Sequence, residues 1–153
     1  MLTKPSSGWS DFQLEGTSVY GLSYLSDIAF DWLAQAIHGL ETMMPFCVKG
    51  YLEPDRFLCV VSYWNCHIVC EDEDWNPLDA EGIINEFSHT DMIQFCKYLY
   101  NDISENIDDW ISFNDYEELD LTERKADIIR KLERLKDLIS QREKCFYRNR
   151  CFY

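Results

Sequence analysis

Cys66, His67 and Cys70 bring together residue types that bind zinc. The valine and isoleucine content around them favours a β-strand over residues 66–71. In a strand, Cys66 and Cys70 share one face but lie about 13 Å apart, and His67 points to the other face. Such ligands cannot converge on one tetrahedral ion, so the sequence predicts no metal site and no other cofactor.

Seven cysteines and three histidines also raise the question of nucleophilic catalysis. A reactive thiolate needs a nearby base and an electropositive setting, whereas this chain is rich in carboxylates. Glycine-rich phosphate loops are absent from the sequence. We therefore predict no catalytic residue and interpret the cysteines as reduced thiols, several of them in the core. A two-residue turn at Trp64-Asn65 would place Cys59 opposite Cys70.

Acidic residues gather in three short groups with aromatic neighbours. Such carboxylates could serve a glycosidase or a two-metal site, could form a solvated acidic rim, or could form a recognition surface. The first group lacks the spacing of an EF-hand calcium loop. Tryptophan is frequent among the anchors of protein interfaces, which favours a partner-binding role. The candidate partner-binding residues are Glu71, Asp72, Glu73, Asp74, Trp75, Asp108, Asp109, Trp110, Glu117 and Glu118.

Charge is divided unevenly along the chain. Residues 1–121 carry 23 carboxylates against four cations, whereas residues 122–153 carry ten cations against five carboxylates. The first part has a formal charge of −19 and the second +5, giving −14 overall. An acidic body attracts basic proteins and repels nucleic acid and anionic membranes, so we expect a basic protein as partner, with no direct nucleic acid and no membrane.

Length and composition are those of one globular domain: 153 residues, 46% hydrophobic and 15% aromatic. No apolar run approaches the ~20 residues that span a bilayer. Residues 1–12 lack the apolar core of a secretory signal. From the sequence we therefore expect a cytoplasmic protein, and we favour a monomer.

Hydrophobic periodicity predicts an α+β fold: an antiparallel sheet of three to five strands with helices on one face and a long C-terminal helix. Residues 9–20 indicate a strand pair or one kinked strand. A meander follows over residues 46–52, 56–64 and 66–71, with a fourth strand at 83–87. One helix starts after Ser23 or Ser26 and stops at Pro45. A second helix runs from a capping box at Ser88 to about residue 107, and residues 108–120 are predicted to be irregular.

The last helix is predicted to start at Asp120. Its apolar residues Ile128, Leu132, Leu135 and Ile139 recur at a helical spacing and form a narrow seam. We divide the chain into an acidic body, residues 1–121, and a basic helix and tail, residues 122–153, with the seam docked on the body. The alternative is a free basic arm that folds on nucleic acid.

The order of these features resembles that of small acidic immunity proteins of contact-dependent and other polymorphic bacterial toxin systems. The resemblance covers the layout of residues 9–107: the opening Trp9–Tyr20 segment, the Ser26-Asp27 helix start, the Glu53-Pro54 turn and the acidic loop 71–81. It implies a cytosolic protein without catalysis that binds one cognate toxin domain, commonly a basic nuclease, and blocks it. A nucleic-acid mimic acting on a defence nuclease, and a carboxylate-based metal enzyme, remain alternatives.

Overall fold

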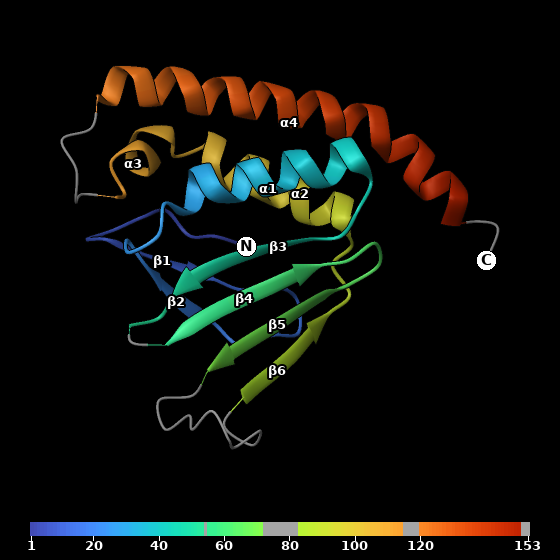
Figure 1. Cartoon of the computed structure of the whole chain (residues 1–153), viewed down its shortest axis with the longest axis horizontal. Coiled ribbons are helices and arrows are strands. Elements are labelled where there is room, and N and C mark those ends of the chain that lie inside the picture. Colours follow the sequence, from blue (N-terminus) through green and yellow to red (C-terminus); the bar gives the residue numbers. More distant parts are fainter. Residues whose placement is uncertain (54, 72–82, 115–119, 151–153) are drawn as a thin grey trace.

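The computed structural model describes residues 1–53, 55–71, 83–114 and 120–150, without the side chains of Glu71, Asn149 and Arg150. Its elements are β1 (Trp9–Phe12), β2 (Tyr20–Ser23), α1 (Ile28–Thr42), β3 (Phe46–Tyr51), β4 (Arg56–Val61), β5 (Cys66–Glu71), β6 (Ile83–Ser88), α2 (Met92–Ser104), α3 (Ile107–Ile111) and α4 (Leu121–Arg150). Helices α1 and α2 lie between the larger sheet and the long helix α4 (Figure 1). The predicted α+β class, with helices on one face and a long C-terminal helix, is confirmed.

The larger sheet is an antiparallel meander in the order β3-β4-β5-β6. Its strands fall where alternating and β-branched residues predict them. The β3–β4 turn closes through the Leu52 N–H, which donates to the Asp55 carbonyl oxygen at 2.7 Å. The opening strand pair, β1 with β2, forms a separate two-stranded sheet.

The register between β4 and β5 corrects one prediction. Residues Ser62–Asn65 make the reversal, since the Ser62 N–H donates to the Asn65 carbonyl oxygen at 2.9 Å and Val61 pairs with Cys66. This four-residue connection shifts the register by two residues from the one that a two-residue loop at Trp64-Asn65 would give. Cys59 therefore lies opposite Ile68, and Phe57 lies opposite Cys70.

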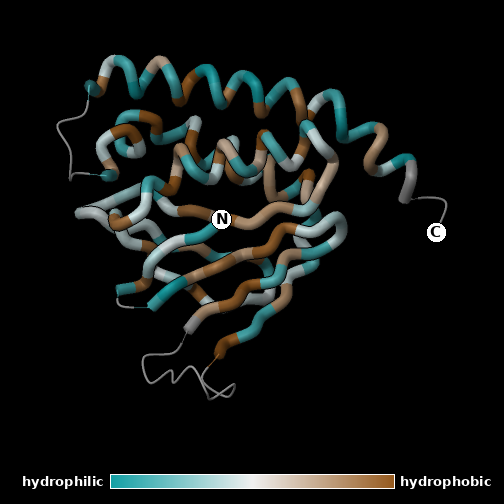
Figure 2. Tube along the Cα trace, in the orientation of Figure 1, coloured by the Kyte–Doolittle hydropathy of each residue, from teal (hydrophilic) through white to brown (hydrophobic). Residues whose placement is uncertain are grey.

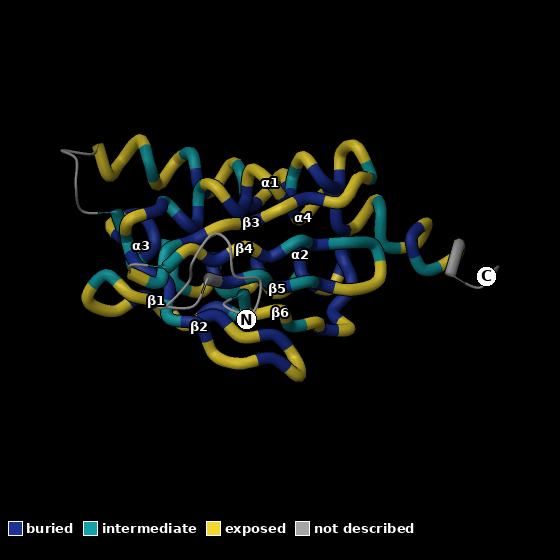
Figure 3. Tube along the Cα trace, turned by 60° about the horizontal axis from the view of Figure 1, so that its bottom comes forward, coloured by how far each residue is buried: buried dark blue, intermediate teal, exposed yellow. Residues whose placement is uncertain are grey.

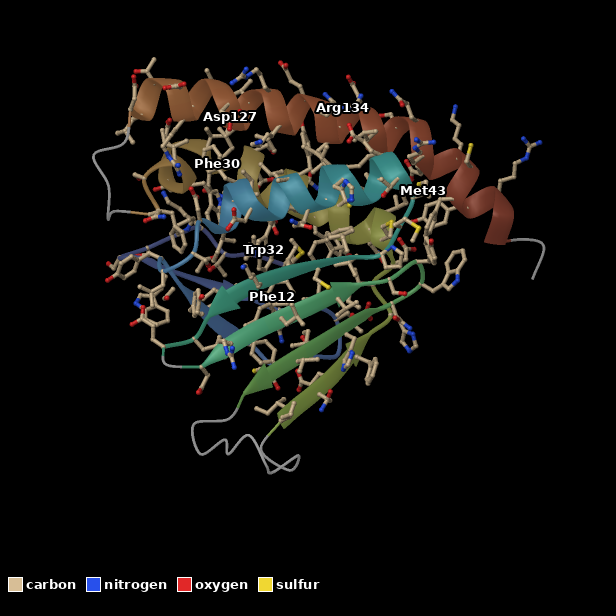
Figure 4. All side chains as sticks on the ribbon, in the orientation of Figure 1. Phe12, Phe30, Trp32, Met43, Asp127 and Arg134 are labelled. Atoms are coloured by element: carbon tan, nitrogen blue, oxygen red, sulfur yellow. The ribbon has the colours of Figure 1, made fainter. Side chains whose placement is uncertain are left out.

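Aromatic side chains fill the space between the inner face of the meander and the helices. Trp32 of α1 has its ring centroid 5.4 Å from Phe12, 6.3 Å from Phe57 and 6.3 Å from Phe95, and all four side chains are fully buried. Figure 4 shows Trp32 between α1 and the sheet. The Trp32 indole N–H donates to the Lys49 carbonyl oxygen of β3 at 2.9 Å, so the one polar group of this buried side chain has a hydrogen-bond partner.

Two helix starts differ from the prediction. The N-cap of α1 is Asp27 rather than Ser23 or Ser26, and it makes no side-chain bond to its own helix. The N-cap of α2 is Asp91, whose carboxylate accepts the Gln94 N–H at 2.9 Å, because Ser88 still belongs to β6. Helix α1 ends against β3 at a close approach: a Cβ at Gly39 would lie 2.2 Å from the Phe46 ring, so only glycine fits.

Helix α4 begins where the sequence predicts, with the Asp120 carboxylate accepting the N–H groups of Thr122 (2.9 Å) and Glu123 (3.2 Å). It lies across α1, α2 and α3. Buried and exposed residues alternate along it with helical period (Figure 3), and its apolar positions are spaced in the same way (Figure 2). The seam residues Ile128, Leu132, Leu135 and Ile139 are all buried, so this helix is docked rather than free.

The C-terminal end of α4 is held by aromatic contacts. The Phe146 ring is buried with its centroid 5.0 Å from that of Trp64, in the β4–β5 reversal. The Tyr147 hydroxyl lies 3.2 Å from both carboxylate oxygens of Asp91, the α2 N-cap. The tail contains the sequence Cys-Phe-Tyr twice, at residues 145–147 and 151–153. The first copy therefore has a structural role, and the second lies outside the described residues.

Candidate partner-binding surface

The ten predicted partner-binding residues fall into three groups in the structure. Glu71 is the last residue of β5, and only its backbone is described. Asp72, Glu73, Asp74, Trp75, Glu117 and Glu118 lie outside the described residues. Asp108, Asp109 and Trp110 are together on the five-residue helix α3, in a segment that the sequence predicts to be irregular.

Trp110 is not a surface anchor, which corrects the prediction. Its side chain has no exposed area, and its ring packs 5.1 Å from the buried ring of Phe113. Asp108 and Asp109 directly precede Trp110, and within this single turn of α3 the Asp108 carboxylate faces solvent while the Trp110 indole is turned inward. A partner cannot reach this indole without opening the core.

Asp108 is exposed and Asp109 is half-buried, and each has a cation within the same chain. The Lys125 ammonium of α4 lies 2.6 Å from the Asp108 carboxylate, and the Lys4 ammonium lies 3.4 Å from that of Asp109. Surface pairs of this kind contribute little to stability, but they cancel local charge. The acidic face of α3 is therefore largely compensated before any partner arrives.

The same compensation continues along α4. Arg124 forms a two-pronged pair with the Asp27 carboxylate (2.9 and 3.1 Å) and also lies over the Phe30 ring, 4.0 Å from its centroid. Arg134 pairs with Glu41 at 2.7 Å, and Figure 4 places Arg134 on the middle of α4. These contacts show that cations of α4 neutralise the helical side of the body.

Arg142 completes this arrangement without a carboxylate. Its guanidinium donates to the carbonyl oxygens of Leu40 (3.1 Å) and Glu41 (3.2 Å), close to the end of α1. Unpaired carbonyl groups at a helix C-terminus carry partial negative charge, which a cation stabilises. The basic helix is thus engaged with its own body along much of its length.

Four acidic side chains outside the helices have no ion pair within the described part of the chain. Glu53 and Asp55 of the β3–β4 turn, together with Asp11 and Glu15, form no ion pair with the described cations. Glu53 also holds a left-handed backbone conformation, with φ of 53°. A non-glycine residue in this region is uncommon and costs of order 1 kcal/mol.

Topology brings part of this charge next to the predicted acidic segment. In an antiparallel meander, the β3–β4 turn, the end of β5 and the start of β6 all lie at one end of the sheet (Figure 1). We call Glu53, Asp55 and the end of β5 at Glu71 the acidic sheet end. Sequence reasoning used the Glu53-Pro54-Asp55 segment as a turn and missed its place beside Glu71, because strand pairing is not visible in one sequence.

A hydrogen-bonded link ties β6 to the two-stranded sheet. The Glu86 carboxylate accepts the Tyr20 hydroxyl at 2.5 Å and the Ser18 hydroxyl and N–H at 2.7 and 2.9 Å. The Tyr20 bond lowers the pKa of Glu86, with the Ser18 bonds acting in the same direction. Burial, followed by the bond to Glu86, raises the pKa of Tyr20. At neutral pH the Glu86 carboxyl group therefore stays ionised and accepts hydrogen bonds, and the Tyr20 hydroxyl stays protonated and donates one.

This link predicts a loss of stability in acid. Because the pKa of Glu86 is lowered on folding, its contribution is present above its ordinary value of 4.5 and is lost as the pH falls through the lower folded value. At pH 7, Glu86→Gln is expected to reduce the free energy of unfolding by about 1–2 kcal/mol. Urea titrations from pH 7 to pH 3 should show this difference shrinking. Glu15→Gln, at an exposed position, is the control, and a difference that persists at pH 3 would contradict the assignment.

The cysteine and histidine group of β5 is divided between the two faces of the sheet. Cys66 and Cys70 are buried on the inner face, whereas the His67 ring stacks on Phe87 at 4.3 Å on the outer face. The described residues contain no group of three or more side chains arranged to hold a metal ion. Burial raises the pKa of the Cys96 thiol, and a bond to Cys66, with burial, raises that of Cys59. Both thiols are thus kept protonated, which opposes nucleophilic chemistry.

Within the described residues, no helix combines the length and apolar character needed to cross a membrane. Comparisons with protein-family models, with curated proteins and with solved structures give no significant match to this chain.

Proposed function

We propose that this protein is a non-enzymatic inhibitor that binds and neutralises a basic partner protein, with a bacterial nuclease toxin domain as the expected partner and the cytoplasm as the place of action. The observation that supports the proposal is the distribution of charge. Cations of α4 pair with the helical side of the body, as in the Arg124–Asp27 and Arg134–Glu41 pairs. Glu53 and Asp55 of the acidic sheet end form no ion pair with the cations that the structure describes.

The mechanism is steering followed by occlusion. A net charge of −14 attracts a basic protein over a distance of about 10 Å in physiological salt. Complementary fields can raise association rates towards ~10⁸ M⁻¹s⁻¹ at low salt. Local contacts made after the encounter then set the dissociation rate, and the bound inhibitor covers the basic surface with which a nuclease holds its substrate.

Capture followed by an inhibition assay tests this proposal. The full chain, immobilised through its N-terminus, is exposed to an extract of its own host, and the retained protein is identified by mass spectrometry and produced separately. We expect a basic protein whose nuclease activity falls to background at one equivalent of this chain. Retention of nucleic acid instead, or a retained protein whose activity is unaffected at a tenfold excess, would contradict the proposal.

A further inference from the structure

The two edges of the four-stranded sheet are protected to very different extents. Strand β3 forms one edge and packs against α1, and its Lys49 carbonyl oxygen accepts the Trp32 indole N–H at 2.9 Å. Strand β6 forms the other edge, and within the part of the chain that the structure describes it pairs with β5 alone. An edge strand with unpaired backbone groups is a template for another strand unless a charge, a proline or a bulge blocks it.

Register identifies which backbone groups of β6 face outward. The Ser62–Asn65 hydrogen bond fixes the alternation of bonded and non-bonded pairs between β4 and β5, so β5 turns the backbone groups of Cys66, Ile68 and Cys70 toward β6. Their partners Ser88, Glu86 and Ile84 face back. The N–H and C=O groups of Ile83, Asn85 and Phe87 therefore point away from the sheet.

These outward groups are almost unoccupied. The Asn85 side-chain amide donates to the Ile83 carbonyl oxygen at 3.3 Å, and the described residues supply no other partner to this edge. No lysine or proline interrupts β6. Its one charged residue, Glu86, is held on the inner face by Tyr20 and Ser18. Within the described residues, the outward backbone groups of β6 are therefore not blocked by a lysine or a proline.

Apolar side chains border the open edge on both faces. Phe87 is 64% exposed and stacks on His67 on the outer face, while Ile84 is 41% exposed on the inner face. Added strands gain affinity from backbone hydrogen bonds and specificity from the side chains beside them. The β6 edge offers outward backbone groups for hydrogen bonding and apolar side chains beside them.

We propose that the outer edge of β6 accepts an extended strand of a basic partner protein, which completes the sheet as a fifth strand. This inference rests on the proposed function for the charge of the partner. A second copy of this chain would bring another −14 charges to the same edge, whereas a basic strand is attracted. The turn that carries Glu53 and Asp55 lies two strands away from β6 and about 14 Å from an added strand, so the net charge of the chain rather than this turn supplies the attraction.

Amide hydrogen exchange on the ¹⁵N-labelled full chain tests this proposal. The probe is a synthetic nine-residue peptide, Lys-Val-Thr-Val-Lys-Val-Thr-Val-Lys, because backbone pairing at an edge depends little on sequence. The matched control peptide carries N-methyl groups on alternate residues, which keeps its charge but blocks pairing. We expect the first peptide to slow exchange at Ile83, Asn85 and Phe87 by about tenfold or more, with little change at Ile84 and Glu86, and the control peptide to have no effect.

Two variants distinguish peptide binding at the β6 edge from peptide binding on the face of the sheet. Phe87→Lys adds a lysine of the kind with which natural edge strands prevent pairing, and it should weaken binding of the peptide about tenfold. Leu58→Lys adds the same charge at an exposed position of the central strand β4 and should change binding less than twofold. Equal effects of the two variants would overturn the assignment to the edge.

The remaining outcomes distinguish this inference from the proposed function. No protection by the peptide at millimolar concentration, or protection outside β6, overturns the edge site, while the captured basic partner tests the proposed function by itself. Protection of the Asn85 amide in the free chain, with a dimeric mass by light scattering, would make a second copy the occupant and overturn the basic strand. If the peptide protects the β6 amides but the inhibition assay fails, the edge site is supported and the proposed inhibitor function is rejected.

Discussion

Replacing Leu135 by alanine is expected to lower the free energy of unfolding by about 2–5 kcal/mol, because it opens a cavity beneath α4. The Leu135 side chain is fully buried where α4 packs on the other helices. Leu132→Ala, at a position with 5% exposure, should have a similar but smaller effect. Urea unfolding followed by tryptophan fluorescence and by circular dichroism measures both changes.

Ile129 gives the matched control for this prediction. It lies on the same helix and is 38% exposed, so Ile129→Ala should change the free energy of unfolding by no more than about 0.5 kcal/mol. If Leu135→Ala and Ile129→Ala melted alike, α4 would behave as an independent arm. The neutralisation of the helical side, on which the proposed function depends, would then fail as well.

Removing charge from the acidic sheet end is expected to slow partner association. The double variant Glu53→Gln with Asp55→Asn should reduce the association rate by about 3- to 10-fold at low salt and change the dissociation rate less. Stopped-flow kinetics with the captured partner measures both rates. Extending the change to the adjoining residues Glu71, Asp72, Glu73 and Asp74 should enlarge the effect.

A second double variant removes the same formal charge elsewhere. Asp108→Asn with Asp109→Asn neutralises two carboxylates that already have Lys125 and Lys4 as partners. If the location of uncompensated charge matters, this double variant should slow association with the partner by less than twofold. Equal slowing by both pairs would show that only the net charge counts, and would remove the acidic sheet end from the interface.

Periodicity explains how much of the fold could be predicted from the sequence. The four-stranded meander and the seam from Ile128 to Ile139 repeat a pattern over several residues, and one face of each is buried, so period and burial agree. Asp120 was found as a helix start because a good capping residue stands directly before a long periodic segment. Such features depend on local sequence and on burial alone.

The errors share another cause, which is contact between distant segments. Helix α3 has five residues, too few for its periodicity to show that Trp110 faces inward while its neighbours face solvent. Asp27 is used by Arg124, 97 residues away, and this long-range pair has no local sign. The open edge of β6 was missed for the same reason, because the alternation of Ile83, Asn85 and Phe87 predicts a strand but not which strand stands last in the sheet.

The salt dependence of partner association tests the central claim most directly. The association rate of the unmodified chain with the captured partner is measured by stopped flow between about 20 mM and about 500 mM sodium chloride, where the screening length falls from about 20 Å to about 4 Å. Recognition through the acidic body predicts a steep fall of about tenfold or more in the association rate, with a dissociation rate that changes much less. An association rate that stays constant across this range would contradict the account.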